Sequence, residues 1–232
     1  MKFPKKFLLL GRQNSSTGVQ KRHRIFIAIN LPADIKKHLA KFEQRFSDLS
    51  RSRSDTGSSY EFDDSNSSGT ALFKWTPEEN IHITMVFLGD LTDIELGEVC
   101  VATRDIAAKH ATLDINLNKV GYEIPFDEAQ GKPPKMLWAS GEKSAELSAL
   151  KKDLEEALLE KVHFVPEKRG FAPHVTMARI SAFAWRAINP EERPNVDEAI
   201  DLLFTAESID VMESEAGRGG PHYTIIESIQ LQ

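Results

Sequence analysis

The pattern His-x-Thr occurs twice in this chain, each time inside a short apolar run typical of a β-strand. The first copy holds His82 and Thr84 in the run Asn-Ile-His-Ile-Thr-Met, and the second holds His174 and Thr176 in Pro-His-Val-Thr-Met. Successive side chains of a strand point to opposite faces, so the His and Thr of each copy share one face. The intervening apolar residues point the other way, into a core. Each copy therefore places an imidazole and a hydroxyl side by side on a rigid strand.

Two such strands facing each other would supply two imidazoles and two hydroxyl donors around a single small anion. Histidine titrates near neutral pH, so one imidazole can accept a proton while the other donates one. A single His-x-Thr is more often a structural feature of a strand, whereas two copies in matching apolar contexts favour a shared function. Their wide separation also fits an internal duplication. The pattern predicts acid–base chemistry on a phosphate.

The spacing of apolar residues predicts an α+β fold that is bilobal and duplicated. We expect two mostly antiparallel sheets with outer helices, one helix pair per half, and a central cleft. Residues 24–232 are predicted to form one domain, after a flexible basic leader at 1–23 and around a flexible Ser-rich loop at 51–70. Strands are expected at 24–30, 72–75, 82–88, 113–121, 135–141, 174–180, and in a closing hairpin of 199–213 with 223–231. Helices are expected at 33–49, 93–109, 144–161 and 183–187.

Composition restricts the possible cofactors and compartments. Cys100 is the one cysteine, so no intrachain disulfide can form, which favours the reducing cytoplasm. The chain has no Cys-x-x-Cys or His-Glu-x-x-His spacing for zinc and no Gly-rich nucleotide loop, so we expect no cofactor. No segment has the length of a membrane span. The net charge is −6 although residues 1–24 are basic, so RNA would be held at an end, in a local basic pocket.

Four segments carry a resemblance to a known family. They are residues 24–32, 74–89, 135–138 and 171–179, in this order. On these segments the chain resembles the two-histidine phosphoesterases. Within them it is most similar to the bacterial and archaeal RNA 2',3'-cyclic phosphodiesterases, historically called 2'-5' RNA ligases. The resemblance extends over residues 24–232.

The resemblance implies a metal-independent hydrolysis of RNA 2',3'-cyclic phosphate ends to 2'-phosphomonoesters, by a protein that we expect to be monomeric. His82 would donate a proton to the leaving 3'-oxygen, and His174 would be the base that activates water. Thr84 and Thr176 would hydrogen-bond the phosphate, and Arg179 would contact it electrostatically.

Two positions depart from the family pattern. Ala172 stands where the family often has arginine, and Val86 stands where lysine is common. Aromatic residues near the motifs could stack a terminal base, namely Phe126, Tyr122 and Phe171.

Two of the tryptophans and the remaining histidines are expected to lie outside the reacting site. Core packing is the expected role of Trp75 and Trp138. The remaining histidines are expected at the surface or in loops: His23, His38, His110, His163 and His222.

Two alternatives stay open. The same residues could cleave or join 2'-5'-linked oligonucleotides, because acid and base exchange roles in the reverse reaction. The chain could also be a non-catalytic module that binds RNA ends, although the presence of both complete His-x-Thr copies favours catalysis.

Overall fold

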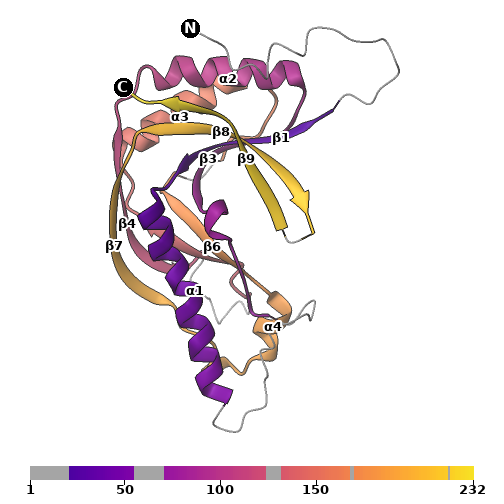
Figure 1. Cartoon of the computed structure of the whole chain (residues 1–232), viewed down its shortest axis with the longest axis vertical. Coiled ribbons are helices and arrows are strands. Elements are labelled where there is room, and N and C mark those ends of the chain that lie inside the picture. Colours follow the sequence, from indigo (N-terminus) through magenta and orange to yellow (C-terminus); the bar gives the residue numbers. More distant parts are fainter. Residues whose placement is uncertain (1–20, 55–70, 124–131, 168–169, 219) are drawn as a thin grey trace.

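All the strands of the described residues belong to one antiparallel sheet (Figure 1). The computed structural model describes residues 21–54, 71–123, 132–167, 170–218 and 220–232. The helices are α1 (Ala33–Ser54), η1 (Glu78–Asn80), α2 (Asp93–Ala107), α3 (Ala145–Leu159), α4 (Ala182–Ala187) and η3 (Pro190–Glu192). The strands are β1 (His23–Asn30), β2 (Phe73–Trp75), β3 (His82–Leu91), β4 (Leu113–Tyr122), β5 (Met136–Gly141), β6 (His174–Ile180), β7 (Asp197–Ala206), β8 (Ser208–Gly217) and β9 (Gly220–Gln230).

The sheet has two halves that meet at a narrow junction. Its strand order is β7-β4-β5-β6-β3-β1-β8-β9. The short strand β2 lies off this path and pairs with β6. The strands β3 and β6 connect the halves through one paired position, Ile83 opposite Val175. The two expected sheets are therefore two halves of one continuous sheet, and each half contributes one His-x-Thr strand to the junction.

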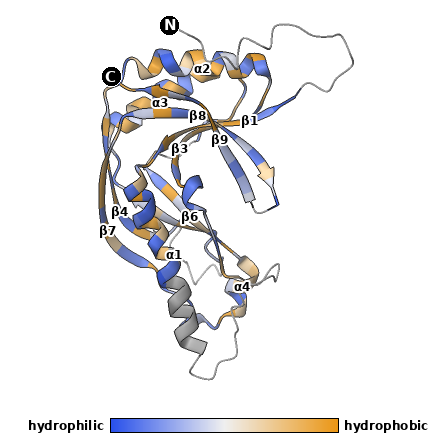
Figure 2. Cartoon of the chain, viewed as in Figure 1, coloured by the Kyte–Doolittle hydropathy of each residue, from blue (hydrophilic) through white to orange (hydrophobic). Residues whose placement is uncertain are grey.

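The helices are distributed unevenly over the two halves. The helices α2 and α3 contact each other, and both contact strands of the β3 half. In Figure 1 they lie together at the top, whereas α1 runs separately through the lower part of the molecule. Apolar and polar residues alternate along α2 and α3 in Figure 2, as expected for helices with one buried face. The prediction of one helix pair per half is thus correct for one half only.

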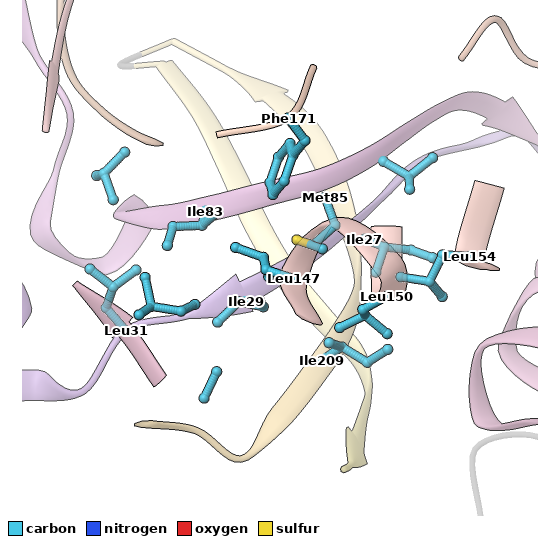
Figure 3. Close-up of a cluster of buried hydrophobic side chains, with 14 of the residues drawn as sticks. Ile27, Ile29, Leu31, Ile83, Met85, Leu147, Leu150, Leu154, Phe171 and Ile209 are labelled. Carbon is cyan, nitrogen blue, oxygen red and sulfur yellow. The ribbon is translucent and has the colours of Figure 1, made fainter. Parts of the chain in front are cut away.

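A continuous apolar core lies on the face of the sheet that α3 covers (Figure 3). Leu147, Leu150 and Leu154 of α3 are fully buried against the strands, where Ile27 and Ile83 are also fully buried. The apolar partners of each histidine therefore point into this core, as the alternation in the sequence predicts.

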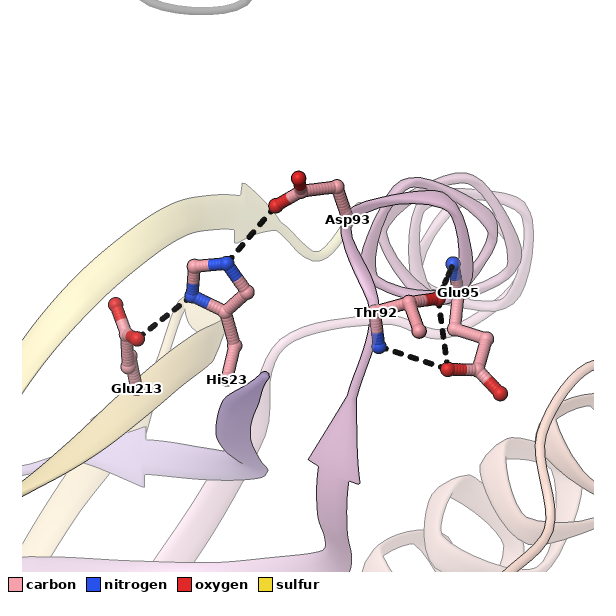
Figure 4. Close-up of polar contacts among 5 residues, drawn as sticks. All are labelled: His23, Thr92, Asp93, Glu95 and Glu213. Carbon is pink, nitrogen blue, oxygen red and sulfur yellow. Dashed lines mark hydrogen bonds and ion pairs between the residues drawn. The ribbon is translucent and has the colours of Figure 1, made fainter. Parts of the chain in front are cut away.

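The boundary between the predicted leader and the domain differs from the prediction. His23 is not a surface residue of the leader, because it is buried at the beginning of β1. Its Nδ1 lies 2.7 Å from Glu213 Oε1 and its Nε2 lies 2.9 Å from Asp93 Oδ1 (Figure 4). Beside it, Thr92 and Glu95 form a capping box that begins α2. His23 thus joins the first strand to β8 and to α2.

Other boundaries were also predicted wrongly. Residues 51–54 continue α1, while residues 55–70 of the predicted loop lie outside the described residues. Strand β3 continues through Gly89, which has φ +80°, to Leu91. The segment 199–213, expected as one strand, is divided at Glu207 into β7 and β8, which lie in different halves of the sheet.

None of the helices in the described part of the chain combines the length and apolar content that a membrane crossing requires.

Candidate active site

The two His-x-Thr motifs meet at the junction of β3 and β6. Ile83 and Val175 are paired there, and both are fully buried in the core. The residues that flank them point to the opposite face of the sheet. His82, Thr84, His174 and Thr176, which we call the tetrad, are all half-buried on this face. The four residues predicted from the sequence therefore lie together at the junction, and we call this face the site face.

Both imidazoles of the tetrad are oriented by the same main-chain contact. Nδ1 of His82 donates to the carbonyl of Asn80 over 2.7 Å, and Nδ1 of His174 donates to the carbonyl of Ala172 over 3.1 Å. In each case the acceptor is two residues earlier. The proton on Nδ1 leaves Nε2 of each ring to accept or donate the reacting proton. His82 Nε2 lies 3.0 Å from the Thr84 hydroxyl oxygen.

Aromatic rings hold the two imidazoles in place. Trp138 stacks on His174 with ring centroids 4.1 Å apart and an interplanar angle of 30°. The ring of His82 lies 5.1 Å from Phe26 and 5.2 Å from Tyr223. Trp138, which we expected in the core, is half-buried on the site face. Sequence reasoning missed these three roles, although Trp138 alternates with buried neighbours along its strand.

The surroundings of His82 disfavour its charged form. Burial is the main cause that lowers the pKa of His82, and the hydrogen bond to Asn80 opposes it. The positive charges of Lys36 and His174 lower the pKa further. The free protein therefore favours a neutral His82.

Lys36 belongs to a chain of polar contacts beside the tetrad. Its Nζ donates to Asn30 Oδ1 over 3.2 Å, and Asn30 Nδ2 donates to Asp210 Oδ2 over 2.5 Å. Asn30 is paired directly opposite His82, so it shares the site face. Burial lowers the pKa of Lys36, and nearby acidic groups such as Asp210 oppose this. The helix α1 thus supplies a cation that sequence spacing does not associate with the motifs.

Arg179 reaches the site face because β6 contains a β-bulge. Thr176 is opposite Trp138, and Ala178 is opposite the buried Leu137, so Met177 is the extra residue between them. Arg179 lies five positions after His174, which in a regular strand would place the two on opposite faces. The bulge returns the exposed Arg179 to the face of the tetrad.

An equivalent bulge in β3 places Phe87 on the site face. Thr84 is opposite Ala28 and Val86 is opposite Ile27, so Met85 is the extra residue. Phe87 is then opposite Phe26 and is 71% exposed. Val86 lies in the buried core, so the absence of the family's lysine there leaves the site face unchanged.

The three stacking residues predicted from the sequence do not form an aromatic platform at the tetrad. Phe171 packs in the core beside Leu147 and is only 9% exposed, so its ring has no face free for a base. Tyr122 is opposite Leu137 on the core face, and its hydroxyl donates to the carbonyl of Pro194. Phe126 lies outside the described residues. The prediction is therefore wrong for Phe171 and Tyr122, because both rings lie on the core face and not on the site face.

Comparisons with known proteins identify relatives of this chain. A family model described as LigT-like phosphoesterase matches residues 65–122. A Geobacillus stearothermophilus protein named RNA 2',3'-cyclic phosphodiesterase is 30% identical over 82% of this chain and 49% of its own length. The chain thus spans about half the length of that relative. An Aquifex aeolicus protein of the same name is 28% identical over 68% of this chain and 81% of its own length.

Solved structures share the fold. The crystal structure of TT0787 of Thermus thermophilus matches with a TM-score of 0.67 and 22% identity, over 90% of this chain and 97% of that one. Escherichia coli LigT complexed with 3'-AMP matches with a TM-score of 0.64 and 16% identity, over 91% and 99% of the two chains. At these identities the likeness establishes a common architecture.

Proposed function

We propose that this chain, which is similar to LigT-like phosphoesterases, hydrolyses RNA 2',3'-cyclic phosphate ends to 2'-phosphomonoesters without a metal ion. The observation that carries this proposal is the tetrad, in which two oriented imidazoles and two hydroxyls share one face at the β3–β6 junction. The names of the relatives agree with it.

The two histidines perform the two proton transfers of the proposed reaction. His174 accepts a proton at Nε2 from water, which attacks the phosphorus in line with the bond to the 3'-oxygen. That bond breaks while His82 Nε2 delivers a proton to the leaving oxygen, and the new P–O bond completes a 2'-phosphomonoester. Thr84 and Thr176 donate hydrogen bonds to the non-bridging oxygens, and Arg179 adds positive charge on the same face.

The negative charge of the bound phosphate favours the protonated form of His82, which is the form that can act as an acid. Burial and neighbouring cations lower the pKa of His82 in the free protein. An anion within contact distance favours the imidazolium form, because opposite charges stabilise each other in a poorly solvated site. Binding therefore prepares His82 to donate its proton.

The exposed ring of Phe87 is the best placed aromatic group for the terminal base. It lies on the site face two ladder positions beyond Thr84, and a base can stack on a sequence-tolerant aromatic surface of this kind.

The decisive experiment measures hydrolysis of nucleoside 2',3'-cyclic phosphates in EDTA by the wild type and by His82→Ala and His174→Ala. Each variant should lose about 10²–10⁴ of the rate, the range of a general acid or base. His163→Ala, which removes an exposed histidine outside the tetrad, should retain the wild-type rate. Formation of a 3'-phosphate, or full activity in either tetrad variant, would contradict the proposal. If the protein cleaves 2'-5'-linked oligonucleotides and does not hydrolyse cyclic phosphates, 2'-5' phosphodiesterase activity would replace the proposed function.

A further inference from the structure

Two exposed cations face each other next to the tetrad. Lys74 of β2 is paired directly opposite Arg179 of β6, and Met136 of β5 is opposite Arg179 on its other side. Residues paired in this way share a face. The Thr176 hydroxyl lies 4.0 Å from Met136 Sδ, which places Met136, and with it Arg179 and Lys74, on the site face.

The two cations have no counter-charge in the described part of the chain. Neither Lys74 nor Arg179 makes a side-chain ion pair or hydrogen bond with a described residue, whereas other basic side chains, such as Arg45 and Arg104, are paired with glutamates. Like charges directly opposite each other destabilise a sheet. In a chain with a net charge of −6, an anion bound between the two side chains would remove this repulsion.

The cation pair lies at one end of the tetrad. Because Met177 is the bulged residue, Arg179 is two ladder positions beyond Thr176, or about 7 Å at the usual rise per residue. Phe87 is two ladder positions beyond Thr84 in β3, and β3 and β6 are antiparallel. Arg179 and Phe87 therefore extend from the tetrad in opposite directions, with the cations at one end and the aromatic ring at the other.

We propose that Lys74 and Arg179 form a second anion subsite, which binds the phosphodiester one nucleotide upstream of the terminal cyclic phosphate of an RNA strand. The inference rests on the proposed function. A nucleoside cyclic phosphate meets the tetrad and the charge of Arg179, whereas an oligonucleotide also brings its upstream phosphate between Arg179 and Lys74. Arginine donates to phosphate oxygens through its planar fork and lysine acts as a point charge, so the two side chains complement each other. The subsite makes an RNA end a better substrate than a mononucleotide.

The test compares kcat/KM for a nucleoside 2',3'-cyclic phosphate and for a short RNA that ends in the same group. Lys74→Met should lower the ratio of the RNA value to the nucleoside value about tenfold, the effect of one charge-assisted hydrogen bond. The slope of log kcat/KM against log salt for the RNA is negative and should become less negative by about 0.7, because one phosphate contact is lost. Lys74→Arg should restore most of the ratio.

Lys109→Met is the matched control. It removes an exposed lysine that follows α2 on the covered side of the sheet, and it should leave the ratio at the wild-type value. If Lys74→Met leaves the ratio unchanged, the subsite is overturned. Hydrolysis of the nucleoside substrate by the wild type would still uphold the proposed function in that case. A wild type that hydrolyses neither substrate would reject the proposed function itself.

Discussion

Met85 and Met177 occupy equivalent positions in the two halves of the molecule, each as the extra residue of a β-bulge directly after a threonine of the tetrad. The carbonyl of a bulged residue leaves the regular ladder and needs another donor. The buried Lys151 Nζ donates to the Met85 carbonyl over 2.7 Å, and the Thr76 amide donates to the Met177 carbonyl over 2.8 Å. The same backbone irregularity is thus satisfied by a side chain in one half and by the main chain in the other.

Removal of the Lys151 side-chain donor should destabilise the fold. Lys151→Met leaves the Met85 carbonyl and Glu155 without their hydrogen bonds, and both contacts are largely shielded from water. Breaking such a pair costs about 3–5 kcal/mol. Chemical denaturation measures this loss. Lys152→Met removes the exposed neighbouring lysine of α3 and should change the free energy of unfolding by less than about 0.5 kcal/mol. Equal effects of the two substitutions would argue against the role of Lys151.

The charge of Lys36 should contribute to the pH dependence of the proposed reaction. In the free protein the pKa of His82 is lowered, so for the proposed reaction the alkaline limb of kcat/KM should lie below the ordinary histidine value of about 6.5. Lys36→Met removes a positive charge that opposes protonation, so the pKa of His82 and the alkaline limb should both move to higher pH. NMR titration of His82 and the pH profile measure the two shifts. Lys37→Met, at an exposed position of α1, provides the control. A downward shift in Lys36→Met would refute this coupling.

The stacking of Trp138 on His174 should affect the rate more than the stability. Trp138→Leu removes the aromatic face that holds the imidazole, while the hydrogen bond from Nδ1 to the Ala172 carbonyl remains. Misplacement of a catalytic base can lower the rate by up to about 10². We therefore expect kcat to decrease by about tenfold to 100-fold. Trp138→Phe should recover part of it. Steady-state kinetics together with thermal denaturation separates the two effects, and an unchanged kcat in Trp138→Leu would show that His174 needs no ring beside it.

The ring of Phe87 should contribute to binding of the terminal base. Phe87→Ala should raise KM for a nucleoside cyclic phosphate by about fivefold to 100-fold, the range of one stacked base, with little change in stability because the ring is 71% exposed. Phe183→Ala on α4 removes an aromatic ring of similar exposure and serves as control. If both substitutions leave KM at the wild-type value, the base binds elsewhere.

The amino-acid pattern alone was enough to predict which residues share a face over short distances. The pairing of His82 with Thr84 and of His174 with Thr176 follows from the alternation of side chains along a strand, and the buried Ile83 agrees with it. Alternation depends only on local backbone geometry, so it can be read from a few consecutive residues. The α+β class and most elements were predictable for the same reason.

Which strands meet, and where their ladders are irregular, depends on the folded structure and could not be predicted from the sequence. The bulge at Met177 brings Arg179 to the site face, against the alternation of the sequence, and the register of β2 places Lys74 opposite it. The division of 199–213 at Glu207 likewise assigns its two parts to different halves of the sheet. These features depend on hydrogen bonds between segments far apart in the chain, whose register is set by the packing of the shared core and not by the residues of any one segment.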